Sequence, residues 1–189
     1  MTVTLGKAVQ EAIRASEVLR RLRDFYRGGA TKREDVHLPT LCADVAQVFQ
    51  NRLRRASASL EIGVDPDVSY LAADATQLEI VLHNLLSNAI DAVLQVARAD
   101  RRIELNGGCA DGWVVLRVED SGPGIVADVA QKLFEPFVTS KPDGMGLGLA
   151  ISRSLVRARG GELSCELSEK LGGACFIVRL PLRHPAEEA

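Results

Sequence analysis

Two asparagines spaced four residues apart, Asn84 and Asn88, are the first candidates for chemistry in this 189-residue sequence. They fall in a stretch, residues 75–97, whose apolar side chains recur at helical spacing. Both amides therefore lie one turn apart on the polar side of a predicted helix, together with Asp91. A carboxamide oxygen can bind a hard cation such as Mg²⁺, which needs few protein ligands when phosphates supply others. Two such asparagines also fit an ordinary solvated helix face.

A second candidate, Asp120, ends an apolar stretch that reads as a strand and opens the sequence Asp-Ser-Gly-Pro-Gly. A carboxylate at a strand end can accept a hydrogen bond from an exocyclic amine such as that of adenine. Gly122 and Gly124 allow a ring to lie close to the backbone. The alternative is an ordinary turn, in which Asp-x-Gly is common.

Glycines at alternate positions, Gly144, Gly146 and Gly148, run into another predicted helix. Small residues at a helix N-terminus expose N–H groups to phosphate, and the helix dipole favours the same charge. The spacing is neither that of a Rossmann motif nor that of a P-loop. Close helix packing through glycine is the alternative interpretation.

Hydrophobic periodicity predicts the elements that position these groups. The order of helices and strands predicts an α+β fold, an open mixed sheet with helices on one face. The predicted helices are residues 4–27, 39–57, 75–97 and 145–159, with a short helical piece at 127–133, and the predicted strands are residues 59–64, 69–72, 102–106, 113–120, 162–166 and 174–182.

Composition excludes several classes of function. A net charge of −2 and few aromatic residues argue against a nucleic-acid partner. The sequence has no apolar run long enough to span a bilayer. Its four cysteines lack the Cys-x-x-Cys spacing of zinc and redox sites, so we expect reduced thiols and a cytoplasmic location.

In this order and spacing, the three motifs resemble those of the ATP-binding catalytic domain of sensor histidine kinases, within the group that includes gyrase-, Hsp90- and MutL-type ATPases. The resemblance covers about residues 36–182. It implies a Bergerat-type two-layer sandwich whose mixed sheet is mostly antiparallel. The segments that carry it are residues 84–92 (N box), 120–124 (G1 box), 133–137 (F box), 144–148 (G2 box) and 172–176 (the last glycine box).

The same resemblance implies ATP and Mg²⁺ as cofactors. It implies Asn88 as the metal ligand, Asp120 as the adenine contact and Lys141 as a contact of the terminal phosphate, although an exposed lid lysine is the alternative for Lys141. Residues 125–143 would form a lid over the nucleotide. The full set of expected nucleotide contacts is Asn84, Asn88, Asp91, Asp120, Gly122, Gly124, Ile125, Lys141, Gly144, Gly146, Leu147, Gly148 and Leu149.

The N-terminal residues 16–25 are similar to the second helix of the dimerisation and phosphotransfer hairpin of kinases that sense nitrogen, oxygen or dicarboxylates. We therefore expect a partial hairpin at 1–29, a linker at 30–35, the catalytic domain at 36–184 and a tail at 185–189. A helix packed on the following domain is the alternative for residues 4–27. The implied partners are the phosphoacceptor helices of the same kinase, a homodimer in the intact protein, and the receiver domain of a response regulator.

Two departures from related families bear on mechanism. Asn84 occupies the position at which gyrase-like ATPases have a glutamate base, so rapid ATP hydrolysis is not expected. None of the three histidines has the sequence context of a phosphoacceptor, so we expect no acceptor in this chain and no autophosphorylation by it alone. The intact protein can still be anchored in a membrane. The alternatives are a related serine kinase of the anti-sigma type and a non-enzymatic module that binds ATP or a partner.

Overall fold

The computed structural model describes residues 34–125, 132–139, 141 and 144–182. The chain divides into two units between residues 31 and 32, and every described residue lies in the second unit. The predicted helix at 4–27, residues 30–33 of the predicted linker, the tail at 185–189 and most of the helical piece at 127–133 lie outside the described residues. The predicted lid is described only at residues 125, 132–139 and 141.

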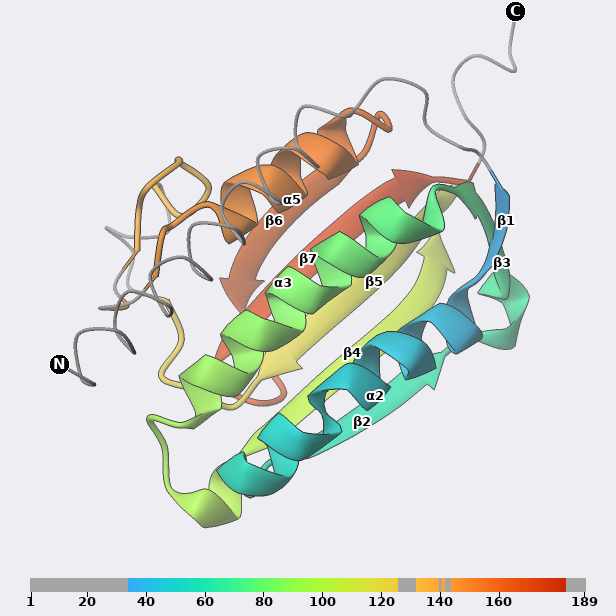
Figure 1. The fold of residues 1–189 in the computed structure, drawn as a ribbon. Coiled ribbons are helices and arrows are strands. Elements are labelled where there is room, and N and C mark those ends of the chain that lie inside the picture. Colours follow the sequence, from blue (N-terminus) through green and yellow to red (C-terminus); the bar gives the residue numbers. More distant parts are fainter. Residues whose placement is uncertain (1–33, 126–131, 140, 142–143, 183–189) are drawn as a thin grey trace, which may run out of the picture. The chain divides into compact units, whose positions relative to one another are not determined.

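Five strands form the main sheet in the order β2-β4-β5-β7-β6 (Figure 1). β2 pairs with β4 in parallel, and the other three pairings are antiparallel. This confirms the predicted mixed, mostly antiparallel sheet. The strands are β2 (Ser59–Val64), β4 (Arg102–Ala110), β5 (Trp113–Asp120), β6 (Glu162–Leu167) and β7 (Ala174–Pro181).

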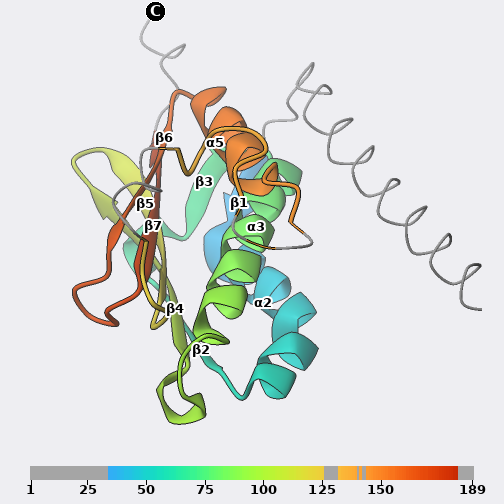
Figure 2. The same cartoon turned by 90° about the vertical axis from the view of Figure 1, so that its left-hand side faces the viewer.

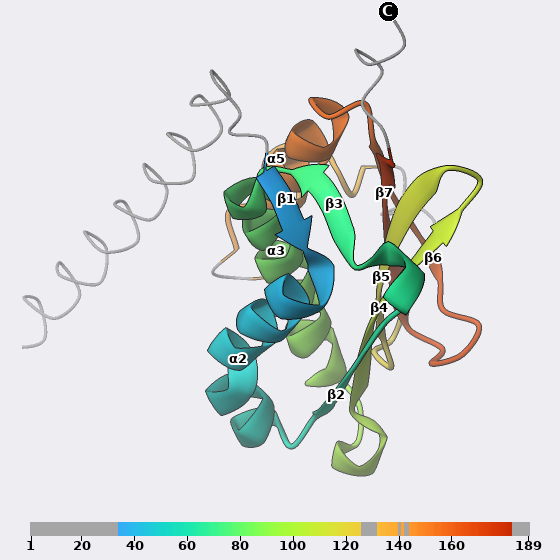
Figure 3. The ribbon, with the colours of Figure 1, turned by 90° about the vertical axis from the view of Figure 1, so that its right-hand side faces the viewer.

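Three helices, α2 (Leu38–Ala56), α3 (Ala75–Val93) and α5 (Gly148–Arg157), cover one face of this sheet (Figure 2). A separate antiparallel pair, β1 (Glu34–His37) and β3 (Tyr70–Ala73), lies at one end of the layer (Figure 3). Short 3₁₀ turns at Pro66–Val68 and Arg98–Asp100 complete the regular structure described. The predicted α+β sandwich with helices on one face is confirmed.

The core fills the space between helices and sheet. Helix α3 lies at its centre and buries a continuous apolar face, because its leucines and alanines recur at helical spacing. The largest side chains that are less than 2% exposed include Phe49, Leu82, Leu86, Ile103 and Leu116, drawn from both layers. The apolar stripe predicted for residues 75–97 is therefore the face that holds α3 on the sheet.

Both ends of α3 have identifiable causes. Asp74 accepts a hydrogen bond from the backbone N–H of Gln77 at 3.1 Å and caps the first turn. The sequence predicts a helix to Ala97, but α3 ends at Val93. Beyond it the Arg101 guanidinium donates to the carbonyls of Leu94 and Val96, and also to Ala56 at the end of α2. The side chain of Arg101, which directly follows the 3₁₀ turn Arg98–Asp100, thus provides partners for carbonyls that a longer α3 would have paired within the helix.

Several predicted boundaries of helices and strands differ from those in the structure, for reasons of strand pairing or backbone conformation. Residues 34 and 35 of the predicted linker belong to β1, which pairs with β3. Strand β4 extends past Asn106 to Ala110, because only Asp111 and Gly112, both at positive φ, form the turn to β5. Helix α5 begins at Gly148 and not at residue 145, since Gly146 has a φ of 66°.

Candidate nucleotide-binding site

The Asp120 carboxyl is buried at the end of β5, with 1% of the residue exposed. Its Oδ1 accepts hydrogen bonds from the backbone N–H of Gly122 at 2.8 Å and of Ala174 at 3.2 Å. Burial raises the pKa of this carboxyl above its usual value, and the two backbone hydrogen bonds offset part of that rise. Oδ2 accepts no hydrogen bond from the described residues, so it is the oxygen that can recognise a ligand.

Glycines bring the backbone close to this carboxyl. A Cβ on Gly173 would lie 2.3 Å from both the carbonyl oxygen and Oδ1 of Asp120, and one on Gly122 would lie 2.8 Å from Cβ of Ala92. The loop after β5 is therefore pressed against the end of α3 on one side and the start of β7 on the other. Gly124, with a φ of 75°, and the half-buried Ile125 continue this loop.

The two asparagines of α3 have different partners. The Asn84 Nδ2 donates to the Gly148 carbonyl oxygen at 3.2 Å and to Ser152 Oγ at 3.1 Å, and so joins α3 to the first turn of α5. The Asn88 Oδ1 accepts a hydrogen bond from Lys141 Nζ at 2.8 Å. Asn84 therefore positions the glycine segment, whereas the oxygen of Asn88 faces a cation.

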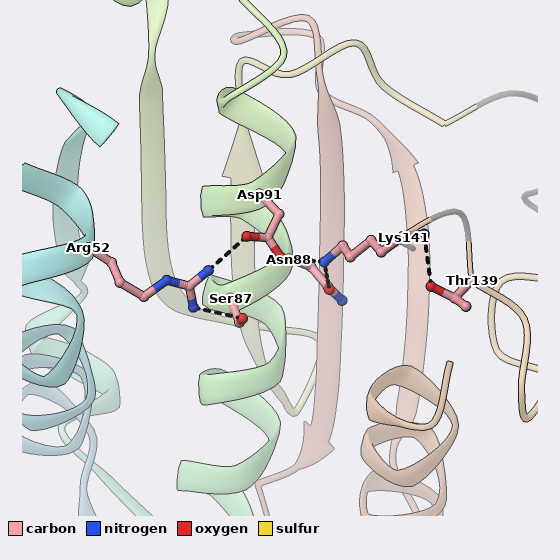
Figure 4. A network of polar contacts seen from close by, with 6 residues as sticks. All are labelled: Arg52, Ser87, Asn88, Asp91, Thr139 and Lys141. Atoms are coloured by element: carbon pink, nitrogen blue, oxygen red, sulfur yellow. Dashed lines mark hydrogen bonds and ion pairs between the residues drawn. The ribbon is translucent and has the colours of Figure 1, made fainter. Parts of the chain in front are cut away.

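A row of charged groups passes beside Asn88 (Figure 4). Lys141 Nζ also lies 2.6 Å from Asp91 Oδ2, and the other oxygen of that carboxylate lies 2.7 Å from Arg52 Nη2. The second guanidinium nitrogen of Arg52 donates to Ser87 Oγ at 2.9 Å. One carboxylate is thus shared by a cation from α2 and a cation from the segment that precedes the glycine run.

The alternate glycines pack against residues 137–139. A Cβ on Gly146 would lie 2.6 Å from the backbone of Phe137 and Val138, and Phe137 N–H donates to the Gly146 carbonyl oxygen at 3.1 Å. The N-terminus of α5 has no side-chain cap and no acidic residue in its first turn. Its amide groups suit an anion such as phosphate. Leu147 is buried and Leu149 is half-buried beside them.

The donor set suits magnesium. Asn88 and Asp91 present oxygen atoms, and the Lys141 ammonium between them shows that a cation is accommodated there. Among the residues that the structure describes, no group of three or more His, Cys, Asp or Glu residues could hold a metal ion. A cation at Asn88 would therefore need phosphate oxygens or waters to complete its shell.

The site residues come from five separate parts of the chain: α2, α3, the loop after β5, the segment from residue 137 into α5, and the start of β7. Sequence reasoning missed Arg52, because it lies 39 residues from Asp91 and in none of the glycine or asparagine motifs. It also did not single out Ser87, although Ser87 lies within residues 84–92. An apolar pocket elsewhere, between β3, α3, α5 and β7, contains none of the predicted site residues. No helix within the described ranges is both long and apolar enough to cross a membrane.

Comparison with known proteins places these features in a family. Residues 73–184 match the family described as histidine kinase-, DNA gyrase B-, and HSP90-like ATPase. The sensor protein FixL of Bradyrhizobium diazoefficiens is 36% identical over 177 residues, which are 94% of this chain and 35% of FixL. The C4-dicarboxylate transport sensor protein DctB of Rhizobium meliloti is 34% identical over 183 residues, 95% of this chain and 29% of DctB. The chain thus spans about a third of the length of these relatives.

Solved structures agree with the sequence comparisons. The catalytic domain of histidine kinase ThkA superposes with a TM-score of 0.71 at 30% identity and covers 79% of this chain and 95% of that one. Full-length ShkA in complex with AMPPNP gives a TM-score of 0.73 at 28% identity, over 93% of this chain and 38% of that one. The chain belongs to the histidine kinase-, DNA gyrase B- and HSP90-like ATPase family and contains the ATP-binding catalytic domain of a histidine kinase.

Proposed function

We propose that this chain binds Mg·ATP and donates the γ-phosphoryl group to a histidine outside the described residues. The observation that carries the proposal is the connection of Asp120, Asn88 and the glycine run around the polar side of α3. The AMPPNP complex of ShkA supports a nucleotide as the ligand. The likeness to the catalytic domain of histidine kinase ThkA supports phosphoryl transfer as the activity.

Each group has a role in this proposal. Asp120 Oδ2 accepts a hydrogen bond from the exocyclic amine of adenine, while Oδ1 accepts hydrogen bonds from two backbone N–H groups. The Asn88 amide oxygen would hold magnesium, which supplies charge neutralisation at the phosphates when bound. The first turn of α5 and the Lys141 ammonium face the phosphates, since both carry positive charge or partial charge. Gly122, Gly124, Gly144 and Gly146 let the backbone approach the nucleotide.

The site favours transfer to a protein over hydrolysis. Asn84 Nδ2 donates to Gly148 and Ser152, and an amide cannot take a proton from water. Phosphoryl transfer needs positioning and charge neutralisation more than covalent help from the protein. The two described histidines have structural contacts, since His37 Nδ1 accepts from the Thr40 backbone and the His83 ring lies 4.6 Å from that of Phe49. The acceptor is therefore expected on other helices.

The partners follow from this activity. Dimerisation and phosphoacceptor helices of the same kinase would present the histidine, in a homodimer, and the receiver domain of a response regulator would take the phosphoryl group from it. A cytoplasmic location suits the use of ATP and the free thiols of Cys42, Cys109, Cys165 and Cys175.

The test mixes the chain with ATP labelled at the γ-phosphate and with a separately produced phosphoacceptor hairpin from a related sensor kinase. The expected result is an acid-labile, base-stable label on the hairpin, and none with Asn88→Ala or with the chain alone. An acid-stable serine label would identify a serine kinase instead. Nucleotide binding without transfer to several hairpins would favour an ATP-binding module, and no nucleotide binding would refute the proposal.

A further inference from the structure

Arg52 is an arginine of α2 that none of the nucleotide motifs contains, yet it reaches the polar side of α3 (Figure 4). Its two terminal nitrogens donate to Ser87 Oγ at 2.9 Å and to Asp91 Oδ1 at 2.7 Å. Its guanidinium carbon also lies 5.5 Å from the ring centroid of the buried Phe49. Contacts with a hydroxyl, a carboxylate and an aromatic face fix this side chain more firmly than a lone surface ion pair would.

The consequence appears at Asp91. Arg52 occupies Oδ1, so only Oδ2 is left for Lys141, whose Nζ lies 2.6 Å away and also 2.8 Å from the Asn88 amide oxygen. Two cations and one carboxylate leave this group with a formal charge of +1. Lys141 therefore occupies the position at the Asn88 oxygen where magnesium would bind. Its other partner is the Asp91 carboxylate, whose charge Arg52 already partly neutralises.

We propose that Arg52 is a positioning residue of the nucleotide site, which acts through Asp91 to let Lys141 leave Asn88 when Mg·ATP binds; this inference rests on the function proposed above. Without Arg52, both oxygens of Asp91 are free to pair with Lys141, and the ammonium is held at Asp91, beside the Asn88 oxygen and away from the phosphates. The local formal charge also falls from +1 to 0, which disfavours the anionic Mg·ATP complex. Both effects weaken nucleotide binding.

The experiment measures Mg·ATP affinity by calorimetry for Arg52→Met in the full chain. We expect about three- to tenfold weaker binding, in the lower part of the range for coupled neighbours. Arg54→Met is the matched control, because it removes the same charge from the same helix and its guanidinium contacts only Asn51 among the described residues. Arg52→Lys keeps the charge but cannot contact Ser87 and Asp91 together, so its affinity should be intermediate.

A double-mutant cycle separates positioning from a general effect on the fold. Arg52 and Lys141 bind different oxygens of Asp91, so Arg52→Met should lose most of its effect in a Lys141→Ala or Asp91→Asn background. An equal loss of affinity in all backgrounds, or the same loss with Arg54→Met, would overturn the inference. If the parent binds Mg·ATP and Arg52→Met binds it equally well, this inference fails while the proposed function stands. A parent that binds no nucleotide overturns both.

Discussion

Replacing Asp120 by asparagine tests adenine recognition, and the structure predicts how the new amide would be oriented. The backbone N–H groups of Gly122 and Ala174 donate to Oδ1 at 2.8 and 3.2 Å, so the new amide must place its oxygen there. The Nδ2 then takes the position of Oδ2 and presents hydrogens to the adenine amine, which is itself a donor. Reversing the amide would set its NH₂ group against two backbone donors. The substitution therefore removes the acceptor without an easy rearrangement.

The expected loss is that of one charge-assisted hydrogen bond, about 1.5 to 3 kcal/mol. This corresponds to roughly 10- to 150-fold weaker ATP binding. Guanine carries an acceptor where adenine carries the amine, so Asp120→Asn should also narrow the preference for ATP over GTP. Calorimetric titration of the parent and the variant with both nucleotides measures the two effects. Glu119→Gln is the control, because the preceding residue points to the other face of β5.

Two results would refute this reasoning. One is a parent that binds GTP as tightly as ATP, because the carboxylate then does not distinguish adenine from guanine. The other is an Asp120→Asn variant with unchanged affinity for ATP and a fold like that of the parent. A loss of ATP affinity that Glu119→Gln shares would point to overall charge and not to a specific hydrogen bond.

The remaining predictions concern metal binding, pH dependence, packing and thiol reactivity. Asn88→Ala should abolish the Mg²⁺ dependence of ATP affinity but change the free energy of unfolding by less than about 0.5 kcal/mol, since the residue is half-buried on the polar face; calorimetry with Mg²⁺ or EDTA and urea titration check both parts. Because the pKa of Asp120 is raised in the fold, its protonated carboxyl contributes stability, and this contribution is lost as pH rises through the pKa of the folded state. Asp120→Asn should therefore be more stable than the parent at pH 7 and lose this advantage toward pH 3.8, and a less stable variant at pH 7 would contradict this. Gly173→Ala should lower the free energy of unfolding by about 1 to 3 kcal/mol, because its Cβ would overlap Asp120, and an unchanged melting temperature would show that the loop relaxes. Iodoacetamide at pH 8 should modify the exposed Cys109 well before Cys175, whose thiol is buried and has a pKa raised to about 12 mainly by burial, and mass spectrometry gives the order.

The parts of the fold that could be predicted from sequence are those fixed by short-range periodicity. The 3.6-residue spacing of apolar residues located α3, and a short apolar stretch located β5 with Asp120 at its last position. The boundaries failed where a distant partner decides them. Arg101 is held at Ala56, 45 residues away at the end of α2, while it also binds the carbonyls of Leu94 and Val96 beyond α3. Pairing with β5 draws Gly107 and Gly108 into β4, although glycine is unfavourable in strands.

The site shows the same division. The residue types and their order indicated which groups lie near the nucleotide, because Asn88, Asp120 and the alternate glycines belong to recognisable local motifs. Sequence could not reveal that Asn84 donates to Gly148 and Ser152, or that Arg52 shares Asp91 with Lys141, since these contacts join residues 39 to 68 positions apart. Such contacts depend on how helices are placed on the sheet, which no window of sequence records.

Helix α3 explains why groups from distant segments can act as one site. Its buried face fixes the helix on the sheet, and its polar side meets a different element at successive turns: α5 at Asn84, α2 at Ser87 and Asp91, and Lys141 at Asn88. Near its end, Ala92 meets the loop after Asp120. Positions four residues apart on one rigid helix keep nearly constant separations. The distance between the adenine acceptor and the cation ligand is therefore set by the packing of a single helix. It follows that a cavity made under α3, for example by Leu86→Ala, should weaken Mg·ATP binding without removing any group that touches the nucleotide.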